Sequence, residues 1–369
     1  MRRTPWRNLV LLLLLPLAAC DWFGDDSDVA RLDLTQSWQT SSPAQARVDA
    51  AQLETAVAEA GAIPRVQSLL VVRDGRIILE EYFHGNERET LNDVRSVTKS
   101  VVATLTAIAL KEGFIGSLDE TLGDHFPPSI APLDSVRRSI SIRHLLSMSS
   151  GFVWPEIGGP AYSDWIQSGD HVRYVLSRPL ENMPGSDFTY NSGAVHLLGV
   201  LVEEAVGVPL EQFADQYLFG RIGIGVEQRE WEILSDGYVN GGAGIDLRTR
   251  DLARLGQLYL QDGRSGKDRI LPRGWVEEAT QPKFEWRSDF GPLSGLCYGY
   301  LWWTEEGQEE YVYLAWGYGG QYIMVVPDKE LVIVTTTYWR GLNQEAGGAN
   351  QLEAAVLDII TSHILPAAR

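Results

Sequence analysis

Ser96 and Lys99, three residues apart, are the side chains in this sequence best suited to nucleophilic chemistry. On a helix, this spacing places both side chains on one face. A serine hydroxyl becomes a nucleophile only when a neighbouring base takes its proton, and a lysine can be that base when burial lowers its pKa. The mostly apolar residues 101–108 predict such burial. The alternative is an exposed Lys99, with Ser96 only capping the helix.

Other common catalytic sites are absent from the sequence. It has no Gly-x-Ser-x-Gly nucleophile elbow, no phosphate loop ending in Gly-Lys-Ser/Thr, and six scattered histidines without metal-ligand spacing, so neither a metal nor another cofactor is predicted. The 49 acidic and 31 basic residues give a net charge of -18, which argues against nucleic-acid binding. The two cysteines exclude a disulfide framework, and Cys297 is expected to be a buried packing thiol.

The elements that must position Ser96 and Lys99 come from both ends of the chain. Residues 68–72 and 76–83 flank Asp74-Gly75 and predict a β-hairpin, and residues 97–112 predict an apolar helix. Further strands are expected over 298–304, 311–316, 322–326 and 331–338, with a closing helix over 351–364. The prediction is an α+β fold: one antiparallel sheet built from both termini and flanked by helices, with a mostly helical region inserted over roughly 115–245. A catalytic cleft is expected at the boundary between the two parts.

Several stretches in order along the chain resemble the serine β-lactamase-like hydrolases. This family includes class C β-lactamases, D-alanyl-D-alanine carboxypeptidases, family VIII carboxylesterases and 6-aminohexanoate-dimer hydrolases. The resembling stretches are 95–100 with the helix after it, 142–151, 184–192, 298–303 and 317–321. The resemblance covers about residues 65–340 and implies the β-lactamase/transpeptidase-like fold.

The resemblance also implies a role for each matching residue. Ser96 would be the acylated nucleophile, Lys99 its base partner, and Tyr190 a third group that shares proton transfer. The oxyanion hole would consist of the backbone N–H groups of Ser96 and Gly320. The residues expected to bind substrate are Ser192, Trp316, Gly317, Tyr318 and Gly319.

Two departures from the family pattern bear on the substrate. Ser192 stands where the second motif usually has Asn, and Gly317 stands where the third motif usually has the Lys or His that binds a carboxylate. Nearby aromatic residues predict an apolar cleft instead: Trp302, Trp303, Trp316, Tyr318 and Tyr322. We therefore expect a serine hydrolase of small esters or linear amides. The alternatives are a weak class C-type β-lactamase or D-Ala-D-Ala carboxypeptidase, and a non-catalytic envelope-binding protein with the same fold.

The first residues predict export and membrane anchoring. Arginines precede an apolar run, and Leu17-Ala18-Ala19-Cys20 resembles the lipobox of bacterial lipoproteins. Residues 1–20 would be a removed signal peptide, Cys20 the acylated membrane anchor, 21–45 an acidic flexible tether and 46–369 the hydrolase domain. The protein would then be a lipoprotein facing the periplasm, on either the inner or the outer membrane.

Overall fold

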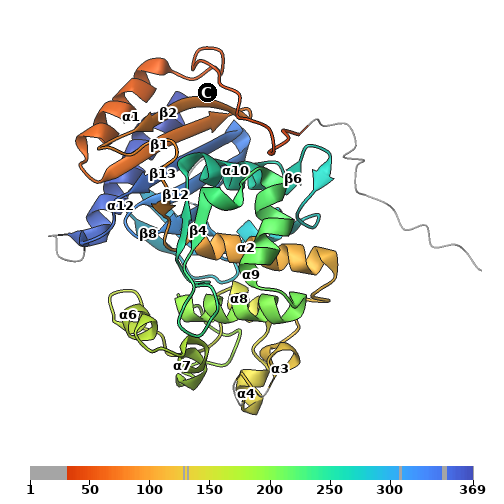
Figure 1. Cartoon of the computed structure of the whole chain (residues 1–369). Coiled ribbons are helices and arrows are strands. Elements are labelled where there is room, and N and C mark those ends of the chain that lie inside the picture. The colour runs from red at the N-terminus through yellow and green to blue at the C-terminus, as the bar shows by residue number, and fades with distance from the viewer. Residues whose placement is uncertain (1–30, 128, 131–132, 307–309, 343–346, 369) are drawn as a thin grey trace, which may run out of the picture. The chain divides into compact units, whose positions relative to one another are not determined.

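One antiparallel sheet of eight strands runs through the computed structural model, which describes residues 31–127, 129–130, 133–306, 310–342 and 347–368 (Figure 1). The strands lie in the order β2-β1-β13-β12-β11-β10-β9-β8. Because β1 and β13 are neighbours, the prediction of a sheet built from both ends of the chain is confirmed. The strands are β1 (Val66–Arg73), β2 (Arg76–Tyr82), β8 (Ser288–Phe290), β9 (Leu293–Tyr298), β10 (Trp303–Glu305), β11 (Val312–Gly317), β12 (Gln321–Val326) and β13 (Leu331–Thr337).

The apolar strands supply two separate cores, because successive side chains point to opposite faces of a sheet. In β1, Leu70 and Val72 join the core on one face, while Leu69 and Val71 join the core on the other. This double burial explains why β1 and β13 are apolar along most of their length rather than alternating. The hairpin between β1 and β2 turns at Asp74 and Gly75, both with positive φ, as predicted from the Asp-Gly pair.

Helices cover both faces of this sheet. On one face lie α1 (Ala50–Ala62) and α12 (Gly348–Ile359), and on the other lies α10 (Thr249–Leu260) (Figure 1). The α10 backbone approaches the sheet so closely that a Cβ at Gly256 would lie 2.5 Å from Val332, so glycine is required there. Also on the α10 side is the helix that carries Lys99, α2 (Val97–Glu112), which ends at Gly113 as predicted.

The middle of the chain is mostly helical, as predicted, and packs around α8 (Ser192–Val206). A second small sheet, in the order β3-β5-β4, joins this region to the residues that precede α2, because β3 lies just before that helix. Its strands are β3 (Asn92–Asp93), β4 (Arg229–Trp231) and β5 (Ile245–Leu247), and the further helices are α3 (Leu122–His125), α4 (Ser135–Arg138), α5 (Ile142–Leu146), α6 (Ala161–Ile166), α7 (His171–Ser177), α9 (Leu210–Ala214) and α11 (Trp275–Thr280).

The expected strand over 298–304 is wrong in its middle. The chain leaves the sheet after Tyr298 and re-enters it at Trp303, so these residues connect two strands, β9 and β10. The backbone of Gly299 lies against α11, where a Cβ would be 2.0 Å from the Ala279 carbonyl oxygen. Leu301, with φ of 59°, anchors the connection through a hydrogen bond from Ser100 Oγ at 2.7 Å.

The N-terminal boundary of the folded domain lies earlier than predicted. Leu34 and Trp38 are buried in the core, and Ser41 and Ile77 are joined by a backbone hydrogen bond of 3.0 Å. The prediction of a flexible tether over 21–45 is therefore wrong for residues 31–45, which pack against the domain. Residues 1–30, which include the signal peptide and the acylated Cys20 of the prediction, lie outside the described residues.

Among the described residues, no single helix is both long and apolar enough to cross a bilayer. One sharply bent pair, Ser192–Val206 with Leu210–Ile222, meets these criteria only when its two halves are taken together.

Candidate active site

The turn before α2 presents Ser96 at the start of the helix. Arg95 adopts φ of 50°, a left-handed conformation that is strained for a non-glycine residue. Its guanidinium lies over the rings of Trp339 (4.2 Å to the centroid) and Tyr162 (5.2 Å), which holds the turn from both sides. Ser96 begins the helix but its side chain makes no capping hydrogen bond to the described helix residues. The hydroxyl is therefore left for Lys99, and the capping alternative is wrong.

Lys99 is buried on α2 and points at the serine. Its Nζ donates to Ser96 Oγ at 2.7 Å and to the Gly242 carbonyl oxygen at 2.6 Å, and the residue is 1% exposed. Burial lowers the Lys99 pKa to about 8; the Glu156 carboxylate raises it and the Arg95 charge lowers it further. A lysine with this pKa is partly neutral near pH 7.5, so it can accept the Ser96 proton.

Tyr190 completes the group on the other side of Ser96. The Ser96 side chain interacts with Tyr190 and acts to lower its pKa, and the Tyr190 ring centroid lies 4.9 Å from Lys99 Nζ. Burial, reinforced by the Glu156 carboxylate, raises the Tyr190 pKa well above its usual range. The phenol therefore stays protonated at neutral pH, so Lys99 is the group placed to take the first proton, and Tyr190 is placed to donate or relay one.

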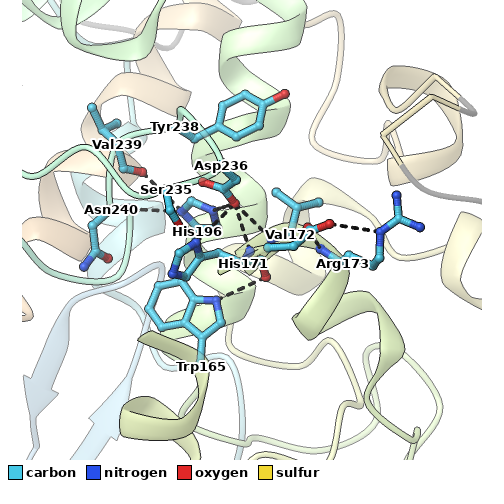
Figure 2. Close-up of polar contacts among 12 residues, drawn as sticks. Trp165, His171, Val172, Arg173, His196, Ser235, Asp236, Tyr238, Val239 and Asn240 are labelled. Carbon is cyan, nitrogen blue, oxygen red and sulfur yellow. Dashed lines mark hydrogen bonds and ion pairs between the residues drawn. The ribbon is translucent and has the colours of Figure 1, made fainter. Parts of the chain in front are cut away.

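A polar cluster fixes the loop that brings Gly242 to Lys99. Figure 2 shows the Asp236 carboxylate directed at His171 and His196, and its Oδ2 lies 3.4 Å from His171 Nδ1 and 3.8 Å from His196 Nε2. Burial acts to raise the Asp236 pKa, but hydrogen bonding and the histidines outweigh it and lower the pKa to about 2. Further along, Asn240 Oδ1 accepts from Gly242 N at 3.1 Å. The cluster thus positions a loop next to the nucleophile.

No metal site accompanies these histidines. Across the residues that the structure describes, no group of three or more His, Cys, Asp or Glu side chains is arranged to hold a metal ion. His171 and His196 lie in the packed interior, 2% and 0% exposed.

Glu156 is a residue of the site that the sequence analysis missed. Its carboxylate accepts from Ser192 Oγ at 2.6 Å, Ser192 N at 2.8 Å and Trp154 Nε1 at 2.7 Å. Ser192, predicted to bind substrate, therefore has its hydroxyl committed to Glu156. Together the two residues place a negative charge near Lys99 and Tyr190. The only signal in the sequence is the position of Glu156 shortly after the 142–151 motif.

The charge of Glu156 sets the pH dependence that we expect. Glu156→Gln keeps an acceptor for Ser192 but removes the charge that raises the Lys99 pKa. Because the reaction needs neutral Lys99, activity should rise with pH through about 8 in the wild type, and this limb should move to lower pH in the variant. The measurement is kcat/KM against pH with a neutral ester. An unmoved limb would contradict this account of the Lys99 pKa.

The turn between β11 and β12 approaches the nucleophile from the sheet. A Cβ at Gly317 would lie 2.2 Å from the Val94 carbonyl oxygen, so no side chain fits where the family usually has a cation. The Gly320 N–H donates to the Gly317 carbonyl oxygen at 3.2 Å, and the Gly319 N–H donates to Glu353 at 2.6 Å. The assignment of the oxyanion donors to the Ser96 and Gly320 amides stays a prediction.

The predicted aromatic cleft is only partly correct. Trp302 and Tyr322 are both fully buried, and Trp302 packs on Tyr259 in the core instead of lining a cleft. Trp303 stacks on Tyr190 with the ring centroids 6.1 Å apart. Trp316 packs on Trp303, with its ring centroid 5.4 Å away. Tyr318 is 38% exposed, and it is the predicted substrate residue that reaches open space.

A cavity of about 690 Å³ adjoins the Ser96 turn. It lies between the sheet and the helical region, where a cleft was predicted, because Tyr318 and Trp339 line one side and Tyr162 the other. Four carboxylates and two guanidiniums also line it: Asp93, Glu230, Glu232, Asp246, Arg95 and Arg340. Burial, together with Asp93 and Glu230, raises the Asp246 pKa to about 6, so at neutral pH the acidic groups still exceed the basic ones.

Comparisons with known proteins show the family to which the chain belongs. The family model described as Beta-lactamase matches residues 50–358. The chain belongs to the Beta-lactamase family. This match bears out the resemblance found in the sequence and, with the antiparallel sheet and its flanking helices, the expected β-lactamase/transpeptidase-like fold.

Relatives within the family are named for different activities. The chain is 25% identical over 290 residues to the 6-aminohexanoate-dimer hydrolase of Paenarthrobacter ureafaciens, covering 74% of this chain and 72% of that protein. It is 28% identical over 300 residues to a putative D-alanyl-D-alanine carboxypeptidase of Escherichia coli (strain K12), covering 63% and 68%. The solved structure of a putative 6-aminohexanoate-dimer hydrolase from Bacillus anthracis superposes with a TM-score of 0.69 at 17% identity, covering 92% and 91%.

Proposed function

We propose that this protein is a serine hydrolase that cleaves small esters or linear amides through an acyl-enzyme on Ser96. The observation that carries the proposal is the contact of Lys99 Nζ with Ser96 Oγ at 2.7 Å, by a lysine whose pKa burial lowers to about 8. The Tyr190 side chain also interacts with this serine. A nucleophile, a base and a proton donor are thus within reach of one bound carbonyl group.

The reaction follows from these positions. Neutral Lys99 takes the hydroxyl proton of Ser96 while Oγ bonds to the substrate carbonyl carbon, and backbone N–H groups stabilise the resulting oxyanion. The bond to the alcohol or amine then breaks, and the leaving group receives a proton through Tyr190. A water molecule attacks the acyl-serine ester in the same way, releasing the acid and restoring Ser96.

The charges around the site support an ester or linear amide over a β-lactam or a peptide C-terminus. Those two substrates carry a carboxylate, which the family usually binds with the cation that Gly317 replaces. Here the neighbouring cavity is lined by four carboxylates and two guanidiniums, so negative charge is in excess. An anionic substrate would be repelled by that excess, whereas a neutral or amine-bearing substrate would not.

Covalent labelling and a substrate panel test the proposal. A fluorophosphonate probe should add one adduct to the intact protein, located on Ser96 by peptide mass spectrometry. A folded protein that takes up no probe would favour the non-catalytic binding protein instead.

Among substrates, kcat/KM for short-chain p-nitrophenyl esters, which carry no carboxylate, should exceed that for nitrocefin, a chromogenic β-lactam that carries one. Faster turnover of nitrocefin would favour the β-lactamase or carboxypeptidase alternative and contradict the role given to the charges around the site.

A further inference from the structure

A buried carboxylate from the C-terminal helix lies directly behind the β11–β12 turn. Glu353, on α12, is 6% exposed, and its Oε1 accepts the Gly319 N–H at 2.6 Å. The Trp316 side chain interacts with the same carboxylate and acts to lower its pKa. It therefore contacts the turn on both sides of Gly317, whose backbone abuts the residues that lead into Ser96.

Among the described residues, no positively charged side chain neutralises the buried carboxylate of Glu353. None of the described arginine, lysine or histidine side chains forms an ion pair with it. The carboxylate accepts the Gly319 backbone amide and interacts with the uncharged Trp316 side chain. Burying a carboxylate without a cation costs folding free energy, whereas an apolar side chain of similar size would avoid that cost. A carboxylate kept in such a position, in direct contact with a turn of the candidate site, is a candidate for a functional role.

The rest of the turn is held at other atoms. Thr337 Oγ1 donates to the Gly319 carbonyl oxygen at 2.6 Å, and Thr335 Oγ1 donates to the Gly320 carbonyl oxygen at 2.9 Å. These two contacts fix the carbonyl side of the peptides from the sheet. Glu353 fixes the amide side from the helix, so the peptide planes of the turn are clamped between two elements.

We propose that Glu353 is a positioning residue of the active site, whose carboxylate holds the turn from Gly317 to Gly320 in the orientation that acyl transfer on Ser96 needs. The proposal rests on the proposed function. A displaced turn would present the Gly320 amide poorly to the developing oxyanion, and such a misplacement of about 1 Å can cost about 10²-fold in rate. The expected defect is therefore in kcat rather than in KM.

Ionisation of Glu353 links this clamp to pH. Burial raises the Glu353 pKa to about 7, against the hydrogen bond from Gly319 and the interaction with Trp316, which lower it. The titratable groups that sense its charge are Tyr318 from the turn, Tyr322 from β12 and Tyr190, and each has its pKa raised by it. Protonation below pH 7 would weaken the bond to the Gly319 N–H, because an ionised carboxylate is the stronger acceptor.

Three variants test the proposal with the short-chain p-nitrophenyl ester. Glu353→Leu should lower kcat by about 10²-fold with KM nearly unchanged. Glu353→Gln retains an acceptor oxygen and should recover most of that loss, but kcat should fall less steeply below pH 7 than in the wild type. The matched control is Glu305→Leu. Glu305 is also a buried carboxylate of the sheet, and it accepts the Ser294 backbone amide at 2.8 Å. This variant should keep the wild-type kcat.

Either of two results would overturn the role given to Glu353. One is a kcat for Glu353→Leu within about twofold of the wild type, and the other is an equal loss in Glu305→Leu. Fluorophosphonate labelling separates this failure from a failure of the proposed function. If the wild-type Ser96 is labelled and Glu353→Leu is labelled at the same rate, only the positioning role is wrong. If the wild type is not labelled at all, the hydrolase assignment itself is wrong.

Discussion

Ser96→Ala is expected to lower kcat with the best p-nitrophenyl ester by about 10⁴-fold or more and to abolish fluorophosphonate labelling. The hydroxyl is the group that would form the acyl bond, so none of the remaining groups can replace it. Because the Ser96 side chain does not cap α2, its loss should leave the melting temperature near that of the wild type.

The matched control for this variant is Ser100→Ala on the same helix. Ser100 Oγ donates to the Leu301 carbonyl oxygen at 2.7 Å, away from the nucleophile. Its removal should cost about 1 kcal/mol of stability and leave turnover intact. Turnover that survives in Ser96→Ala would place the nucleophile elsewhere and remove the basis of the mechanism.

Lys99→Met is expected to produce the second large loss, about 10³-fold in kcat, because it removes the general base and keeps the apolar stem. Stability should not fall at pH 7, since the variant no longer buries an ammonium group. In the wild type, the Lys99 pKa is about 8 when folded against 10.5 for the model value. Between these values the unfolded state holds more protons, so this group makes wild-type stability rise with pH, and the variant should lack that rise.

Steady-state kinetics and thermal unfolding from pH 7 to 10.5 measure both effects of Lys99→Met. The control is Lys283→Met: Lys283 is another lysine with a pKa lowered by burial, and its Nζ donates to the Glu278 carbonyl oxygen, outside the site. This variant should retain wild-type kcat. A Lys99→Met protein with near-wild-type turnover would mean that another group takes the Ser96 proton.

Much of the fold could be predicted from the sequence because its signals are local. The Asp74-Gly75 turn, the apolar run of α2 and its stop at Gly113 each determine structure within a few residues. The connection through Gly299 could not be predicted, because aromatic residues there have strand propensity while their burial depends on distant elements. Residues 31–45 are a similar case, since their polar composition conceals the two side chains, Leu34 and Trp38, that bind them to the core.

The residues of the candidate site likewise divide into those that the sequence could predict and those that it could not. Ser96 and Lys99 are close in sequence and share a helix, so their contact follows from spacing alone. Glu156 and Glu353 act on the site from segments far from it in sequence, and nothing local distinguishes them from other acidic residues. The aromatic residues near the third motif show the opposite error. Proximity in sequence suggested that Trp302 and Tyr322 line a cleft, but Trp302 packs on Tyr259 in the core and Tyr322 is buried within β12.

The pairing of β1 with β13 has a consequence for how the protein is made. Ser96, Lys99 and Tyr190 are all synthesised well before Leu331–Thr337, the strand that pairs with β1 on one side and β12 on the other. Contacts between such distant segments form slowly, and only once the later strand has been synthesised. A chain interrupted before Leu331 would hold all three of these residues without the sheet that aligns them, so incomplete products should be inert rather than promiscuous.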